Sequence, residues 1–240
     1  MRRLVVLAAF LGLVTTVVAC EPGGADVTIA LWQMNEGSGA RTMVDSGPKG
    51  INGSIGSAVQ TGVSQSGAKG YRWSAVNPTA PPAKPERLVR VPDSRLNPGS
   101  RDFAVTVRFR TTASSGNMIQ KGQGQTPGGY FKWEIPGGRP FCLFASLDSQ
   151  GNLRGSRGIK APRALNNGAW HTVRCEKTAD QVVMTIDGST VVRSSTGPIG
   201  SISNSMPLSI GGKSQCDQVS VDCDYWAGDI DWVRIEASSG

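Results

Sequence analysis

The 240-residue sequence predicts an all-β fold, a two-sheet antiparallel β-sandwich. Helical periodicity is nearly absent, whereas apolar and polar residues alternate with a period of two in many short segments. Gly, Asn, Asp and Pro separate those segments, and the chain holds 31 Gly and 14 Pro. Many short strands joined by such turns are typical of a sandwich or barrel. With 38% hydrophobic and 18% charged residues, the composition excludes a disordered chain.

The first element, residues 1–19, is predicted to be a secretory signal peptide. Two arginines precede the apolar stretch Leu4–Val18, which at about 1.5 Å per residue is too short to span a bilayer as a helix. Small residues place the cleavage after Ala19, with a cut after Ala25 as an alternative. The same stretch with Cys20 resembles a bacterial lipobox, so plain secretion and lipidation of Cys20 both stay open. Either way we expect an extracellular protein, secreted or lipid-anchored at the cell surface.

A short linker, residues 20–26, leads into one domain of residues 27–236 and a tail of residues 237–240. The clearest strand is Phe103–Arg110, in which every second residue is apolar and faces the core. Asp187-Gly188 is the dipeptide of a type I′ hairpin turn, and the Pro-rich run 77–85 is predicted to be a surface loop within the same domain. The remaining predicted strands are, in order, Val27–Met34, Arg87–Val91, Asn117–Lys121, Tyr130–Ile135, Phe141–Leu147, Ala169–Lys177, Gln181–Ile186, Ser189–Arg193 and Asp229–Glu236.

The chain has five cysteines, an odd number for an exported protein. Cys20 lies at the processing site, which leaves Cys142, Cys175, Cys216 and Cys223 inside the fold. Four cysteines allow three pairings. Cys216 and Cys223 are close enough to close a short loop, and Cys142 then pairs with Cys175. The alternative is a zinc site of four thiolates, but the tight C-x2-C spacing of such sites is absent.

The charge is uneven along the chain. The net charge is +7, and removing the two leader arginines leaves +5. Residues 84–163 carry fourteen basic and five acidic side chains, and residues 164–240 carry five basic and nine acidic ones. A basic stretch attracts nucleic acid or anionic glycans. Here the arginines stand singly between apolar residues, which indicates a solvated strand face, and we predict no nucleic-acid partner.

Four segments carry a family resemblance. Residues 31–39 read Leu-Trp-Gln-Met-Asn-Glu-Gly-Ser-Gly and are followed by Asp45-Ser46-Gly47 and Ile51-Asn52-Gly53. Residues 165–173 with a Trp-His pair, 183–188 ending in Asp-Gly, and 228–235 follow in order. Together they resemble bacterial laminin G-like domains of the concanavalin A-like lectin/glucanase superfamily. The resemblance covers residues 27–236 and implies a concanavalin A-like jelly roll. This fold hosts lectins, glycosidases, adhesion modules and structural domains, so it does not identify a ligand.

The sequence predicts no catalytic residues. A retaining glucanase needs two carboxylates about 5 Å apart, but no Glu-x-Asp-x-x-Glu run occurs and no two of the six Glu lie within ten residues of each other. The one histidine, His171, has no G-x-S-x-G nucleophile to serve. We therefore interpret His171 as structural.

The resemblance implies one candidate metal site and requires no cofactor. Sandwich lectins often hold a structural calcium between the first and last strands, so Asp231 with Glu36 or Asp45 is the implied ligand set. Five aspartates between residues 217 and 231 supply further oxygen ligands, which suit calcium. The alternative is that these aspartates are solvated or bind backbone N–H groups.

Sugar binding would use exposed aromatic rings. Tyr130 shares the polar face of its strand with Lys132 and Glu134, which places Trp133 in the core. Tyr225 and Trp226 follow Cys223, so a rigid loop would display them. Hence the predicted binding residues are Tyr130, Tyr225 and Trp226, whereas Trp32, Trp170 and Trp232 are predicted to be core residues.

These observations predict an exported, non-catalytic, monomeric binding module for carbohydrate or a cell-surface glycan. It would contact a membrane only through a lipid anchor. The alternatives are a structural or adhesive sandwich that binds another protein and, third, a divergent glycoside hydrolase.

Overall fold

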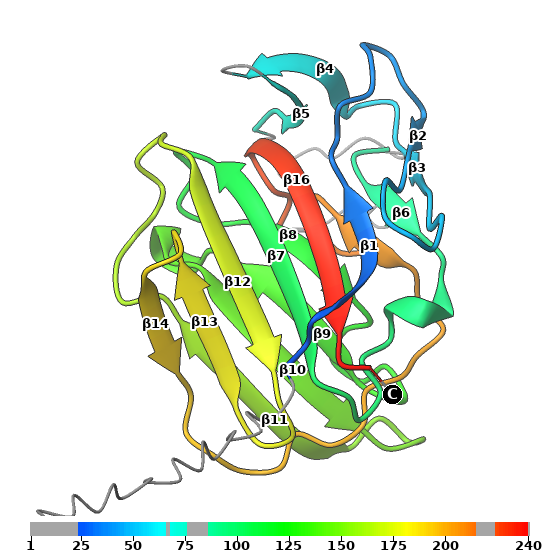
Figure 1. Ribbon diagram of the computed structural model, residues 1–240, viewed down its shortest axis with the longest axis vertical. Helices are drawn as coiled ribbons and strands as arrows, with labels where there is room; N and C mark the ends of the chain where they lie inside the picture. Colours follow the sequence, from blue (N-terminus) through cyan, green and yellow to red (C-terminus); the bar gives the residue numbers. More distant parts are fainter. Residues whose placement is uncertain (1–23, 66–67, 76–85, 215–223, 240) are drawn as a thin grey trace, which may run out of the picture.

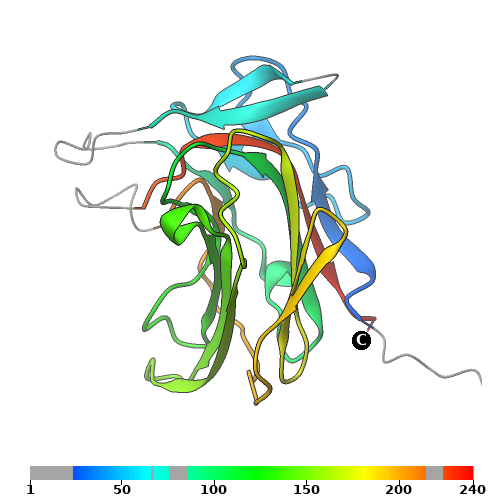
Figure 2. The same ribbon diagram turned by 90° about the vertical axis from the view of Figure 1, so that its left-hand side faces the viewer.

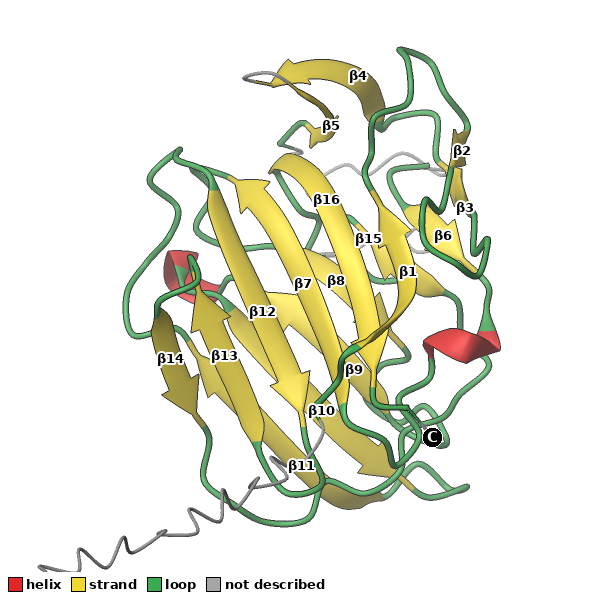
Figure 3. Cartoon of the chain, in the orientation of Figure 1, coloured by secondary structure: helices red, strands yellow, loops and turns green. Residues whose placement is uncertain are grey.

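The structure, a computed structural model, describes residues 24–65, 68–75, 86–214 and 224–239, which form two eight-stranded sheets (Figure 1). The sheets pack face to face, as the edge-on view in Figure 2 shows. All pairings between these strands of the described chain are antiparallel. The described residues also include the short 3-10 helices η1 (Ser94–Leu96) and η2 (Pro136–Gly138) (Figure 3). The predicted all-β sandwich is confirmed.

Sheet A contains the long central strands. Its order is β14-β13-β12-β7-β16-β5-β4, and β1 pairs with the second half of β16. The bounds are β1 (Val27–Trp32), β4 (Gln60–Gln65), β5 (Ala68–Trp73), β7 (Phe103–Arg110), β12 (His171–Lys177), β13 (Val182–Ile186), β14 (Thr190–Arg193) and β16 (Gly228–Ala237).

Sheet B has the order β11-β10-β9-β8-β15-β6-β3-β2. The bounds are β2 (Thr42–Met43), β3 (Gly53–Ile55), β6 (Val89–Val91), β8 (Asn117–Lys121), β9 (Tyr130–Glu134), β10 (Phe141–Leu147), β11 (Leu153–Lys160) and β15 (Leu208–Ile210).

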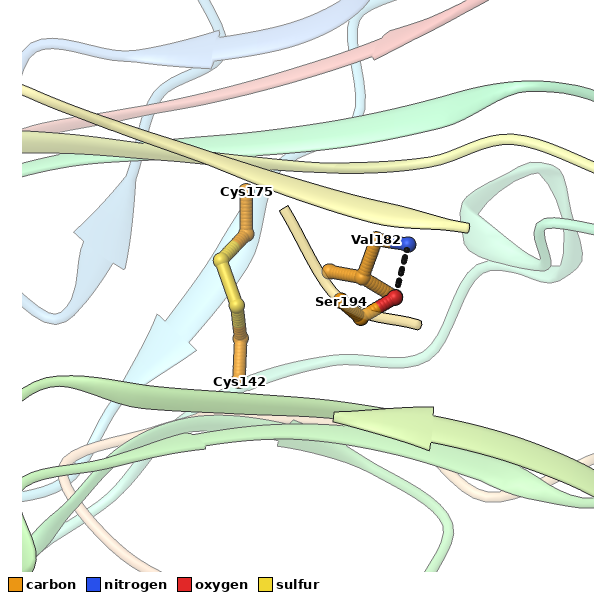
Figure 4. Close-up of a disulfide and its surroundings, with 4 residues drawn as sticks. All are labelled: Cys142, Cys175, Val182 and Ser194. Atoms are coloured by element: carbon orange, nitrogen blue, oxygen red, sulfur yellow. Dashed lines mark hydrogen bonds between the residues drawn. A yellow bond between two sulfur atoms is a disulfide. The ribbon is translucent and has the colours of Figure 1, made fainter. Parts of the chain in front are cut away.

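One hydrophobic core fills the space between the sheets. Phe103 of sheet A meets Phe131 of sheet B with ring centroids 5.4 Å apart. The disulfide Cys142–Cys175 joins β10 to β12 across the core, with Cα atoms 6.6 Å apart (Figure 4). This predicted pair is confirmed, whereas Cys20, Cys216 and Cys223 lie outside the described residues.

Several predicted strands have the observed bounds. β7, β8 and β10 begin and end at the predicted residues. In β7 the alternation of apolar residues marks the face that enters the core. Asp187 and Gly188 both have positive φ, at 50° and 71°, as a type I′ turn requires.

Other elements differ from the prediction for local reasons. The first strand ends at Trp32, since Met34 has φ 52° and leaves the extended region. β11 was not predicted because its glycines hide the alternation. A Cβ on Gly158 would lie 2.8 Å from the Phe141 ring, so glycine lets that ring lie against the strand. No helix in the described part of the chain is long and apolar enough to cross a membrane.

Candidate ligand-binding site

A cleft of about 280 Å³, which we call the rim cleft, lies where β7 ends and β16 begins. These strand ends are at the top of both strands in Figure 1. Four segments line it: Arg72 and Trp73 of β5, residues 110–112, Gly168, and Gly228 with Asp229 of β16. Antiparallel pairing of β16 with both β5 and β7 brings these distant segments together.

A buried carboxylate organises the rim cleft. Asp229 is 4% exposed and is paired in register with Arg72 on one side and Arg110 on the other. Arg72 donates from Nε to Oδ1 at 2.7 Å and from Nη2 to Oδ2 at 3.0 Å, and Arg110 donates from Nε to Oδ2 at 2.8 Å. Burial acts to raise the pKa of Asp229, but both arginines outweigh it and hold that pKa below its usual value.

An aromatic ring lies beside this cluster. The guanidinium carbons of Arg108 and Arg110 are 4.7 and 5.0 Å from the centroid of Trp170. Arg108 also forms an ion pair with Asp231. The prediction that Trp170 is a core residue is wrong, because the ring is only half-buried against outward-facing arginines. Trp232 is likewise half-buried, with Arg234 5.9 Å from its centroid.

The loop before β12 forms one wall of the rim cleft. Its Gly168 N–H donates to the carbonyl of Thr111 at 2.9 Å, which ties the loop to the end of β7. Gly168 has φ +77°, a conformation that glycine adopts without steric cost. At the base of the loop, His171 is 6% exposed and both of its ring nitrogens have partners, as expected for a structural histidine.

The arrangement favours ligands that accept hydrogen bonds. Three arginines, at positions 72, 108 and 110, face two carboxylates, Asp229 and Asp231, so the cluster has one net positive charge. Each guanidinium has five N–H donors, and Asp229 accepts only two from Arg72 and one from Arg110. The remaining donors suit a carboxylate or hydroxyl groups.

The predicted binding residues do not come together at this cleft. Tyr130 is half-buried in β9 of sheet B, beside the Lys132–Glu134 ion pair of 2.9 Å. Tyr225 is half-buried with Arg87 5.4 Å from its ring centroid.

The prediction that Trp226 is displayed is wrong. The residue is fully buried and packs edge-on against Phe109 with centroids 5.7 Å apart. Glycines make room for its ring, since a Cβ on Gly228 would lie 2.8 Å from Trp226 Cζ2.

The implied calcium ligands do not form one set. Asp45 accepts backbone N–H groups from residues 31, 47 and 51 at 2.7 to 2.8 Å. Glu36 accepts from the Val44 N–H at 2.7 Å and from the Tyr71 hydroxyl, whereas Asp231 is paired with Arg108. Among the described residues, no three His, Cys, Asp or Glu side chains are grouped to hold a metal. Calcium binding stays a prediction, and a calcium-dependent rise in melting temperature is its test.

Comparison with known proteins identifies the family. A sequence profile of the laminin G domain matches residues 109–236, more than half of the chain. The chain belongs to the laminin G domain family. The laminin subunit alpha-1 of Mus musculus is 30% identical over 90 residues, which are 38% of this chain and only 3% of that protein. Laminin G domains are binding modules and are typically extracellular.

Solved structures share the fold of this laminin G domain. One concerns botulinum neurotoxin type C, whose cell entry is described as dependent on two ganglioside molecules. It is 12% identical, with a TM-score of 0.59 over 90% of this chain and 49% of that one. The binding domain of Paraclostridial Mosquitocidal Protein 1 is 11% identical, with a TM-score of 0.56 over 89% of this chain and 48% of that one. At such identities the likeness concerns the fold alone.

The sequence contained partial signals of the rim cleft. Arg110 and Asp229 occupy outward positions of predicted strands, next to the core residues Phe109 and Ile230. Their meeting was not visible, because the sequence does not show that β7 and β16 pair in this register. Arg72 was missed because β5 was not predicted as a strand. The Trp-His pair of residues 170 and 171 marked the loop, but not which side of the sheet its tryptophan covers.

Proposed function

We propose that this laminin G domain is an exported, non-catalytic carbohydrate-binding module that takes a sugar of a cell-surface glycan in the rim cleft. The observation that carries the proposal is the pair Arg72 and Arg110 on the buried Asp229, beside the half-buried Trp170. Sugars are recognised by directional polar groups next to an aromatic surface. The rim cleft supplies the polar groups, and the Trp170 ring lies against its lining residue Arg110.

The chemistry of the rim cleft favours an acidic sugar. The cleft has one net positive charge and an excess of N–H donors over acceptors, so a carboxylate on the sugar would gain charge-assisted hydrogen bonds. Asp229 holds the arginine side chains in place before a ligand arrives. Less side-chain entropy is therefore lost on binding.

The proposal extends to localisation and partners. The leader of residues 1–19 supports export, and the lipobox-like sequence supports a lipid anchor at Cys20 as the sole membrane contact. The structural neighbour whose description names two ganglioside molecules is consistent with a glycan partner. We propose a monomer.

A second candidate is an adhesive module that binds another protein. The outer face of sheet A favours it, because ion pairs such as Arg174–Glu236 and Arg108–Asp231 cover that face. Such a charged face offers polar contacts over a larger area than the cleft.

A glycan array read with and without EDTA tests the proposal. Wild-type protein should bind acidic saccharides, and Arg110→Ala and Trp170→Ala should each reduce binding about tenfold or more. Arg154→Ala is the matched control, because Arg154 is an exposed arginine of β11 paired with Asp148. Tyr130→Ala tests whether the outer face of sheet B contributes to saccharide binding.

The outcomes separate the candidates. Saccharide binding that survives Arg110→Ala and Trp170→Ala would exclude the rim cleft as the site. An array without saccharide hits would favour the protein-binding alternative. Loss of binding in EDTA would point to the calcium predicted from the family resemblance.

A further inference from the structure

We propose that His171 is a pH-dependent positioning residue for the rim cleft: the protonated ring holds the loop of residues 167–170 in place, and the neutral ring loosens it. This inference rests on the proposed function of the cleft, because it concerns regulation of the same site. It is carried by hydrogen-bond geometry around the single histidine of the chain.

Both ring nitrogens of His171 face acceptor oxygens. Nδ1 lies 2.9 Å from Oδ2 of Asp187, and Nε2 lies 3.0 Å from Oδ1 of Asn167. The amide orientation of Asn167 is fixed, since the same Oδ1 accepts the Ala169 N–H at 2.9 Å. A neutral imidazole has one N–H and an imidazolium has two, so only the protonated ring donates both hydrogen bonds.

The hydrogen bond between His171 Nε2 and Asn167 holds the loop that lines one side of the rim cleft. His171 begins β12, pairs in register with Phe109 and directly follows Trp170. Asn167 precedes Gly168, which lines the cleft and bonds to the Thr111 carbonyl. When the ring loses a proton, the carboxylate of Asp187 retains the remaining N–H. The lone pair of Nε2 then faces Oδ1 of Asn167, so the loop loses its hydrogen bond to the His171 ring.

Charged and polar groups of neighbouring elements surround His171. Asp187 lies in the turn between β13 and β14 and also accepts the Thr172 N–H at 2.8 Å, and Arg163 lies 4.0 Å from Asp187 Oδ2. Burial acts to raise the pKa of Asp187, but the bonds from His171 and Thr172 and the nearby positive charges hold that pKa below its usual value.

Strand β7 also contacts this region. β7 contributes the Phe109 ring, 6.4 Å from the imidazole, and the arginines at 108 and 110 lie against the adjacent Trp170. The carboxylate of Asp187 thus stays charged throughout the range, about pH 5 to 8, in which imidazoles change charge.

These hydrogen bonds set the direction of the pH dependence. The second hydrogen bond is present while the ring carries two protons, which low pH favours, and is lost when the ring gives up one of them at higher pH. We expect the protection of the Gly168 and Ala169 amides against hydrogen exchange to fall about fivefold, the change that one hydrogen bond typically gives. Affinity for the ligand of the cleft should fall by a similar factor.

NMR on the full chain tests the proposed role of His171 without a ligand. The chain has one histidine, so the ring 15N signals belong to His171 and report whether one or both nitrogens are protonated. Asn167→Ala removes the Nε2 partner, and with it the acceptor of the Ala169 N–H, but keeps the bond to Asp187, so Gly168 is the amide to compare. The variant should give low protection of Gly168 at every pH, whereas His171→Gln should abolish the pH dependence.

A second measurement uses 3′-sialyllactose as the probe and lactose as the neutral control, at pH 5.5 and 8.5. Wild-type affinity for the acidic probe should be about fivefold higher at the lower pH, with no such change in Asn167→Ala. The proposal is overturned if the His171 ring stays singly protonated at pH 5.5, or if Asn167→Ala keeps the wild-type pH profile of protection. If the probe binds at neither pH, the proposed function fails, and ring titration and amide protection still decide the role of His171.

Discussion

Arg72 and Asp229 face each other on the paired strands β5 and β16, and two hydrogen bonds of 2.7 and 3.0 Å join their side chains. The carboxylate is buried, whereas the Arg72 side chain is 42% exposed and reaches solvent at the rim cleft. One side-chain pair therefore fastens β5 to the central strand of sheet A and shapes the candidate site. Stability and binding should both depend on Asp229.

Asp229→Asn should destabilise the fold by about 1 to 3 kcal/mol, because Arg72 and Arg110 lose a shared counter-charge and one amide cannot accept all three bonds. Urea denaturation gives the free energy of unfolding. Asp180→Asn, at an exposed turn position, is the control and should change stability by less than about 0.5 kcal/mol. Equal effects of the two variants would contradict the role of Asp229.

The Cys142–Cys175 disulfide closes a loop of 33 residues and joins the two sheets (Figure 4). Replacing both cysteines with alanine should lower the free energy of unfolding by about 3 to 4 kcal/mol, since the unfolded chain gains the entropy of the opened loop. Guanidinium denaturation of the variant and the wild type measures this difference. A denaturation midpoint shared by the variant and the oxidised wild type would show that the bridge does not contribute.

Strand alternation predicted much of the fold. In β7 the apolar residues 103, 105, 107 and 109 all enter the core, so the faces were visible in the sequence. The strands that were not predicted depend on tertiary contacts. β11 needs glycine against the Phe141 ring, and β15 has three residues, too few to show a period.

The site was less predictable than the fold. Trp170 was expected in the core and Trp226 on the surface, and the structure shows the opposite. Each residue lies next to the end of a strand, where a shift of one residue moves a side chain to the other face of the sheet. Trp226 passes between the sheets over Gly228, whereas Trp170 lies outside on two arginines. Alternation along one strand does not reveal such placements, which arise where three chain segments meet.

The buried Lys121 makes the free energy of unfolding depend on pH. The residue is 1% exposed, and its ammonium donates to the carbonyls of Asn204 and Met206. Burial lowers the pKa of Lys121 to about 8, below the value near 10.4 of an unfolded chain. The folded state therefore binds fewer protons than the unfolded state between these values, so this contribution to stability rises with pH above about 8.

Lys121→Met should remove the pH-dependent contribution of Lys121 to the free energy of unfolding. Between pH 7 and 9.5 we expect the rise in unfolding free energy to be about 2 kcal/mol smaller than in the wild type. Urea denaturation across this range measures it, and the exposed Lys160→Met is the control, with the wild-type slope expected. The same slope in Lys121→Met as in the wild type would exclude Lys121 as the source.

The contacts of Ala25 favour one of the two predicted cleavage sites. Although Ala25 lies in the predicted linker, it is 3% exposed, its N–H donates to Glu176 Oε1 at 2.7 Å, and its carbonyl accepts from Arg174 at 2.8 Å. A cut after Ala25 would leave these two β12 side chains without their backbone partners. We therefore expect processing upstream, after Ala19, so that Cys20 becomes the first residue, lipidated or free.

Intact-mass analysis and N-terminal sequencing of the exported protein measure the cleavage site directly. As a matched comparison, a chain that begins at Asp26 should unfold with about 1 to 2 kcal/mol less free energy than one that begins at Cys20, since two hydrogen bonds to charged side chains are lost. Glu176→Gln in the longer chain should reproduce part of that loss, because it weakens the bond that the Ala25 N–H donates. An exported protein whose first residue is Asp26, with the stability of the longer chain, would show that Ala25 is dispensable.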